Sequence, residues 1–117
     1  MNSFDNEFFS LLDQIVRESE IVIDRPRGTS HPKYPSFIYP VDYGYLKNTS
    51  SMDGDGIDVW VGSGKKKIDA VICTVDSLKK DSEIKVLIGC TAEEKSIIYK
   101  TLNESEYMKG IMIERQK

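Results

Sequence analysis

Apolar segments in this chain are short, and proline, glycine or charged residues interrupt them repeatedly. Runs rich in β-branched or aromatic residues predict five or six short strands. The segments with this signal are residues 20–24, 36–39, 57–61, 68–75, 84–89 and 108–113. Neither a repeat nor a linker-like segment divides the chain. Because short strands of this number favour a strongly curled sheet or a small barrel, we expect one α+β domain over residues 1–117.

Two segments have helical signals. In residues 4–18, apolar side chains recur at helical spacing and form one stripe. This stripe could pack on the chain's own sheet or on a neighbouring copy, so the question of whether the protein is a homo-oligomer stays open. Near the other end, Thr91 and Glu94 form a capping-box pattern, which predicts a helix of about ten residues.

The segments between these elements are rich in turn residues. Residues 25–36 hold three prolines and one glycine, which leave little room for regular structure. The only histidine, His31, lies in this loop, where histidine is more often solvent-exposed than catalytic. We expect an irregular segment from Pro40 that includes Tyr43-Gly44-Tyr45, and a hairpin loop over residues 76–83.

Composition excludes several classes of protein. The content is 39 % hydrophobic and 30 % charged, and the net charge of −3 gives no general attraction to nucleic acid. No apolar stretch approaches the roughly 20 residues that span a membrane, and the N-terminus does not resemble a signal peptide. Cys73 and Cys90 lie in apolar runs, which predicts buried free thiols. We therefore expect a cytoplasmic protein without nucleic-acid or membrane partners.

Residues 39–60 contain the densest group of chemically active side chains. Asp53, Asp55 and Asp58 lie within six residues, with glycines between them. Such carboxylates repel one another unless a cation or hydrogen bonds compensate, and hard oxygen ligands suit Mg²⁺, Mn²⁺ or Ca²⁺. Tyrosines that precede them in the segment can donate hydrogen bonds to an anion. The combination suggests a metal–phosphate site.

Two common loop motifs do not fit this chain. An EF-hand is excluded, because its central glycine, third acid and final glutamate are all missing when Asp53 is counted as the first ligand. A P-loop at Gly62-Ser63-Gly64-Lys65 is excluded, because Val59 stands at the position of its first glycine. A turn in which Asp and Gly serve only the backbone stays open.

The motif Tyr-Pro-Val-Asp-Tyr-Gly-Tyr, followed by Asp-Gly-Asp-Gly-Ile-Asp-Val, resembles the core of the soluble (family I) inorganic pyrophosphatases. Gly56 replaces a proline of the family motif. Weaker similarity extends over residues 20–115. The resemblance implies a small curled antiparallel sheet or OB-like β-barrel with two helices. It also implies that water activated by a divalent metal hydrolyses pyrophosphate, or a related small phosphoanhydride, to phosphate.

The resemblance further implies roles for individual residues. Asp53 and Asp58 would hold Mg²⁺, or alternatively Mn²⁺, with Glu83 and Asp24 as further metal ligands. Asp55 would accept a proton from the attacking water or orient it, and Tyr43 would assist. The residues implied in substrate binding are Lys33, Tyr39, Tyr43, Lys85, Tyr99 and Lys100.

The chain departs from the family pattern in its shorter length. A β-hairpin, with an arginine that contacts phosphate, is missing between Lys33 and Tyr39, and Arg25 or Arg27 would have to substitute. One family aspartate before Glu83 has no clear counterpart; the candidates are Asp76 and Asp81. A site trimmed in this way is expected to be slower, or open to larger substrates.

Three hypotheses therefore stand. The first is a divalent-metal-dependent diphosphatase. The second is a non-catalytic module that binds a phosphate ligand and has lost part of the site. The third is an acidic loop with only a structural role.

Overall fold

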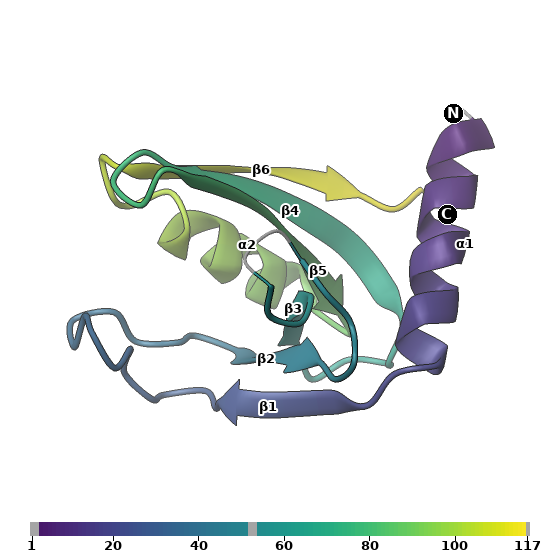
Figure 1. Ribbon diagram of the computed structural model, residues 1–117, viewed down its shortest axis with the longest axis horizontal. Coiled ribbons are helices and arrows are strands. Elements are labelled where there is room, and N and C mark those ends of the chain that lie inside the picture. The colour runs from purple at the N-terminus through teal and green to yellow at the C-terminus, as the bar shows by residue number, and fades with distance from the viewer. Residues whose placement is uncertain (1–2, 52–53, 117) are drawn as a thin grey trace.

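The computed structural model describes residues 3–51 and 54–116, which form two helices and one six-stranded sheet (Figure 1). The helices are α1 (Ser3–Arg17) and α2 (Ala92–Thr101). The strands are β1 (Ile21–Arg25), β2 (Asp42–Leu46), β3 (Asp58–Val61), β4 (Ile68–Asp76), β5 (Asp81–Ile88) and β6 (Met108–Glu114).

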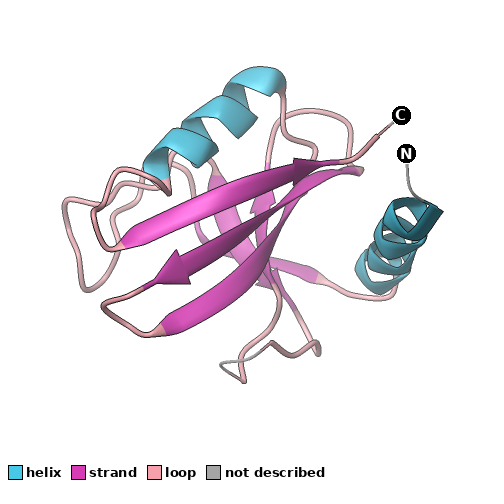
Figure 2. Cartoon of the chain, turned by 90° about the horizontal axis from the view of Figure 1, so that it is seen from above, coloured by secondary structure: helices cyan, strands magenta, loops and turns pink. Residues whose placement is uncertain are grey.

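The sheet is mixed and does not close. Its strand order is β1-β2-β3-β5-β4-β6, with β3 and β5 parallel and every other neighbouring pair antiparallel. The sheet twists and curls around α2, while α1 stands across the strand ends at one side (Figures 1 and 2). The predicted α+β class with two helices is thus confirmed, as a curled open sheet rather than a barrel and with one parallel pair.

The strand prediction was wrong in two segments. Residues 36–39 form no strand and make only an isolated bridge between Ser30 and Ile38, whereas the segment around Gly44 forms β2. A Cβ at Gly44 would lie 1.8 Å from the carbonyl oxygen of Val22 on β1. Glycine at this position therefore permits the close approach of β1 to β2, which tertiary contact decides and local propensity does not.

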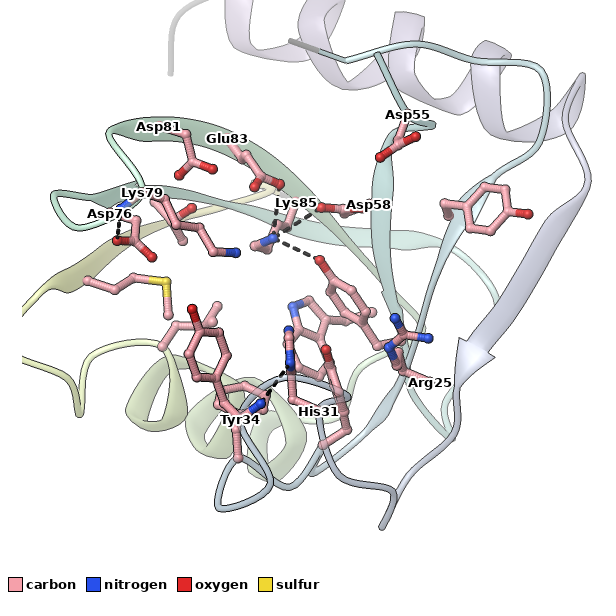
Figure 3. A pocket seen from close by; sticks show the side chains of 18 of the residues that line it. Arg25, His31, Tyr34, Asp55, Asp58, Asp76, Lys79, Asp81, Glu83 and Lys85 are labelled. Atoms are coloured by element: carbon pink, nitrogen blue, oxygen red, sulfur yellow. Dashed lines mark hydrogen bonds and ion pairs between the residues drawn. The ribbon is translucent and has the colours of Figure 1, made fainter. Parts of the chain in front are cut away.

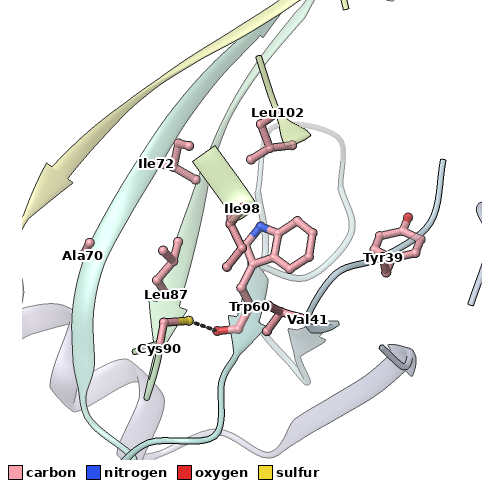
Figure 4. Packing of buried hydrophobic residues seen from close by; sticks show 9 residues of the cluster. All are labelled: Tyr39, Val41, Trp60, Ala70, Ile72, Leu87, Cys90, Ile98 and Leu102. Atoms are coloured by element: carbon pink, nitrogen blue, oxygen red, sulfur yellow. Dashed lines mark hydrogen bonds between the residues drawn. The ribbon is translucent and has the colours of Figure 1, made fainter. Parts of the chain in front are cut away.

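Two clusters of buried side chains lie on the two faces of the sheet. Trp60 and Leu87 belong to the cluster under α2 (Figure 4), whereas Val59 and Val86 belong to the other, which α1 covers. This alternation confirms that Asp58 and Trp60 share a face opposite Val59. Cys90 is buried in the first cluster and Cys73 is only partly buried; both are free thiols.

Helix α2 begins as predicted. Thr91 Oγ1 accepts the Glu94 N–H at 3.2 Å, and Glu94 Oε1 accepts the Thr91 N–H at 2.9 Å. The same Glu94 carboxylate accepts the Ser63 N–H at 3.1 Å. The Gly62-Ser63-Gly64 turn is thus not simply solvated: it anchors the start of α2.

Helix α1 packs on the sheet of its own chain. Phe9 is 3 % exposed within the second cluster, and the Arg115 guanidinium donates two hydrogen bonds to the Asp13 carboxylate, at 2.9 and 2.8 Å. Phe4 and Leu11, about 140–160° around the helix from Phe9, are exposed. No helix in the part of the chain that the structure describes is long and apolar enough to cross a membrane.

We expect Phe9→Ala to lower the free energy of unfolding by about 3–5 kcal/mol, because it leaves a cavity between α1 and the sheet. The matched control is Phe4→Ala, since Phe4 is 71 % exposed on the same helix; it should change stability by no more than about 0.5 kcal/mol. Urea unfolding of the two variants measures both values. An equal loss in both would mean that α1 docks through another face.

Candidate functional site

One large cavity lies on the concave side of the sheet. Its volume is about 830 Å³, and strands β1 to β5, the loop around His31 and the segment before β6 line it (Figure 3). Because side chains alternate along a strand, the residues that share a face with Trp60 point into this cavity. The cavity is therefore built from segments that lie far apart in the sequence.

A buried lysine stands at the centre of its polar end. The Lys85 ammonium lies 2.8 Å from the Tyr43 hydroxyl oxygen, 3.1 Å from Asp58 Oδ2 and 3.2 Å from Glu83 Oε2. These side chains come from the adjacent strands β2, β3 and β5. Lys85 is only 7 % exposed. One cation therefore holds two carboxylates together in a largely desolvated place.

The environment of this cluster shifts the proton affinities of its members. Burial opposes the charge on Lys85, but the Tyr43 oxygen and the two carboxylates outweigh it, so the lysine pKa is raised. The pKa of Glu83 is also raised, first by a hydrogen bond shared with Asp58 and then by burial, although Lys85 opposes this. Burial raises the pKa of Tyr43. Lys85 is thus a fixed cation and Tyr43 a neutral hydroxyl at neutral pH.

A β-bulge shapes the β1 side of the cavity. The pairing of β1 with β2 shifts register between Ile23 and Arg25. Two consecutive residues, Asp24 and Arg25, consequently both line the cavity, which a regular strand would not allow. Of the two arginines considered as substitutes for the missing one, only Arg25 is among these lining residues.

The acidic loop reaches the cavity through Asp55 and Gly56. A Cβ at Gly56 would lie 2.6 Å from the Leu46 carbonyl oxygen, so the loop packs closer to β2 than the family's proline would allow. Asp55 is exposed on the cavity wall and lies toward the same space as Asp58 in Figure 3. Asp53 lies outside the described residues.

The chemistry of these donors fits a hard divalent cation. Asp24, Asp55, Asp58 and Glu83 all line the cavity, and carboxylate oxygens are the ligands that Mg²⁺ prefers. The Asp58 and Glu83 carboxylates both contact the Lys85 ammonium and so lie close together, where a further cation would reduce their mutual repulsion. Within residues 3–51 and 54–116, no three His, Cys, Asp or Glu side chains already form a metal cage.

The structure gathers most of the residues that the sequence singled out, but not all. Asp24, Tyr39, Tyr43, Asp55, Asp58, Glu83 and Lys85 line the cavity, as do the candidates Asp76 and Asp81. Lys33, Tyr99 and Lys100 are not among its lining residues. Ile98 of α2 and the C-cap residue Leu102 are the buried positions. Tyr99 and Lys100 follow Ile98 on other sides of the helix, and Tyr99 lines a separate hollow beside β6.

Several lining residues were missed or given little weight. His31, expected to be solvent-exposed, lines the cavity and is partly buried, because its loop folds back over the sheet. Tyr34 and Phe37 of the same loop, and Lys79 of the β4–β5 turn, also line it. The concentration of aromatic residues between Tyr34 and Tyr45 was the available signal. Nothing local in the sequence indicated that the turn would reach the same cavity.

Comparison with known proteins defines the class. The sequence model of the family Inorganic Pyrophosphatase matches residues 20–114. The match covers most of the chain, including every strand of the sheet. This chain belongs to the inorganic pyrophosphatase family. A comparison with curated proteins gave no match.

Solved structures show the same fold at low identity. An inorganic pyrophosphatase from Neisseria gonorrhoeae matches with a TM-score of 0.61 and 16 % identity, covering 76 % of this chain and 77 % of that one. One from Coxiella burnetii matches with a TM-score of 0.57 and 14 % identity, covering 81 % and 84 %. One from Helicobacter pylori gives 0.53 and 15 %, covering 82 % of both chains. At this identity the likeness shows the fold.

Replacement of Lys85 tests the buried cluster. We expect Lys85→Met to lower the free energy of unfolding by about 3–5 kcal/mol at neutral pH in EDTA, because two carboxylates lose their shared cation. Lys79→Met, at an exposed lysine of the same cavity, is the control and should cost no more than about 0.5 kcal/mol. Urea unfolding measures both. A loss under about 1 kcal/mol for Lys85→Met would contradict the cluster as described.

The raised pKa of Glu83 predicts a pH dependence. The folded protein holds this proton more tightly than the unfolded chain, so the contribution to stability is complete below the ordinary pKa of 4.5. It is lost as pH rises through the folded-state value. Glu83→Gln removes this titration. The unfolding free energy of the unchanged protein minus that of the variant should therefore fall as pH rises from 4.5, in EDTA.

The control is Glu104→Gln at an exposed glutamate, measured over the same pH range, which separates the effect of the buried site from that of a surface glutamate. A flat or rising difference for Glu83→Gln would show that Lys85, and not Asp58, dominates the environment of Glu83.

Proposed function

We propose that this protein hydrolyses the phosphoanhydride bond of inorganic pyrophosphate in the presence of Mg²⁺ or Mn²⁺. The observation that supports this most strongly is the joint presence of Asp55, Asp58, Glu83 and Lys85 in one cavity of a pyrophosphatase-family fold. Carboxylates that can hold cations and a fixed ammonium that can hold an anion are what a phosphoanhydride substrate requires.

Each side chain has a role that follows from its environment. The Lys85 ammonium cannot lose its proton at neutral pH and offers a permanent positive charge to a phosphate oxygen. Tyr43 stays neutral, so its hydroxyl can donate a hydrogen bond to the same anion. Arg25, at the bulge of β1, offers a guanidinium that suits a phosphate group.

Asp55 is proposed as the general base. Its side chain is on the exposed part of the cavity wall, where it can accept a proton from the attacking water. Asp24, Asp58 and Glu83, with Asp53 outside the described residues, are proposed to hold the metal. When bound, divalent ions neutralise phosphate charge and make water a better nucleophile. The roles assigned to Lys33, Tyr99 and Lys100 stay predictions.

We expect phosphate release from pyrophosphate with Mg²⁺ or Mn²⁺ and none in EDTA. Asp55→Asn should lower the rate by at least about 100-fold, because it removes the base while keeping the shape of the side chain. Asp5→Asn, on the exposed surface of α1, is the matched control and should keep the full rate. A colorimetric phosphate assay measures these rates.

Absence of phosphate release from pyrophosphate with either metal would contradict the proposal. Calorimetry would then distinguish a binding module from a structural loop. Tight binding of pyrophosphate without turnover supports a binding module, whereas no binding supports a structural role for the acidic loop. If Asp55→Asn does not slow phosphate release, another residue is the general base.

A further inference from the structure

The cavity is larger than pyrophosphate requires. Its volume of about 830 Å³ lies in the upper part of the range for sites that hold drug-sized ligands, roughly 300–1,000 Å³. Pyrophosphate is only two phosphate groups joined through one oxygen. The polar end around Lys85 can accommodate it, which leaves the rest of the cavity without an assigned ligand group.

Another part of the cavity lining is aromatic. The ring centroids of His31 and Tyr34 are 5.0 Å apart, those of Phe37 and Tyr39 are 5.1 Å apart, and the His31 and Tyr39 rings are near-parallel at 15°. Figure 3 shows His31 and Tyr34 together on the side that faces Asp76, Lys79 and Glu83. The ring faces of this wall offer no favourable contact to an anion whose surface is all oxygen, whereas a flat heterocycle can stack on them.

Part of this aromatic wall is accessible from the cavity. Tyr34 is 48 % exposed, and two further exposed side chains, Leu78 and Tyr107, line the cavity from the β4–β5 turn and the segment before β6. Apolar lining that stays exposed indicates a ligand with an apolar part. The Trp60 indole N–H, on the cavity lining, also has no acceptor among the described residues.

His31 suits a stacking role because it is uncharged. Burial lowers its pKa, and the nearby cations Lys79, Arg25 and Lys33 lower it further. Its Nδ1 accepts the backbone N–H groups of Lys33 and Tyr34, at 3.0 and 3.3 Å, which puts the proton of the neutral ring on Nε2. A neutral ring with one N–H donor can stack on a base or donate to its edge.

A second ammonium group also lines the cavity. Lys79 lines the cavity, and in Figure 3 its side chain extends across it toward Lys85. A ligand that joins a flat ring to a chain of phosphates would thus meet stacking partners and two ammonium groups in sequence.

We propose that the cavity takes nucleoside 5′-polyphosphates, with the base on the Tyr34–His31 wall and the phosphoanhydride beside Lys85. This inference rests on the proposed function, which supplies the reaction. In it, a water oxygen bonds to the terminal phosphorus as the anhydride P–O bond breaks. Inorganic phosphate and a proton are released, and the bridging oxygen stays with the shortened nucleotide. The aromatic wall sets substrate choice and takes no part in that step.

Binding measured without turnover tests the inference. The probes are the α,β-methylene analogue of ADP, methylenediphosphonate and the bismethylene analogue of tripolyphosphate, each titrated with Mg²⁺ into the full chain by calorimetry. We expect the ADP analogue to bind more tightly than both compounds that lack a base. Tyr34→Ala should weaken binding of the ADP analogue about tenfold and change methylenediphosphonate binding by less than about twofold, because one stacking face is lost.

Two further variants separate stacking from other causes. Tyr34→Phe keeps the ring and should retain the affinity for the ADP analogue. Phe4→Ala removes an exposed aromatic ring of α1, outside the cavity, and should leave every affinity unchanged. An equal loss of affinity for all three probes in Tyr34→Ala would overturn the inference, since it would reflect a damaged loop.

The inference and the proposed function can fail separately. Hydrolysis of pyrophosphate, with no tighter binding of the ADP analogue than of the bismethylene analogue of tripolyphosphate, overturns the inference and supports the proposed function. Binding of the ADP analogue through Tyr34, with no phosphate release from any compound, supports the nucleotide site and overturns the proposed hydrolysis.

Discussion

The buried ammonium of Lys85 is the interaction on which the site depends. It joins Tyr43 of β2, Asp58 of β3 and Glu83 of β5, all within 3.2 Å of the nitrogen. Removal of an ammonium from water is costly, and so is the approach of two carboxylates to each other. Each cost is offset only when the three charges are buried together. The same three charges make one end of the cavity strongly polar.

The one parallel strand pair explains why these residues meet. In a parallel pair both strands begin at the same end of the sheet. Val59 of β3 pairs with Val86 of β5, and this register places Asp58 beside Lys85. The acidic loop precedes β3 and the β4–β5 turn precedes β5, so both reach the same cavity. If β3 and β5 were antiparallel, the acidic loop and the β4–β5 turn would lie at opposite ends of the sheet.

Local signals predicted much of the fold. The capping box predicted the start of α2, and β-branched runs predicted the first and last residues of β1, β4 and β6 to within a residue or two. The wrong predictions fell at residues whose state depends on distant contacts. Gly44 was expected in an irregular segment and instead permits β1 to approach β2. His31 was expected in an exposed loop, yet that loop folds back over the cavity.

The sequence by itself determined the chemistry: the carboxylates of the acidic loop, the phenols before it and the family to which the chain belongs. These follow from residue types at short spacing, which any conformation preserves. Only the tertiary structure decided which of them share a cavity. It brought Arg25, His31, Tyr34 and Lys79 to the site and turned Tyr99 toward a different hollow. The reason is that a bulge, a loop fold and the rotation of a helix are set by long-range packing, which local sequence does not encode.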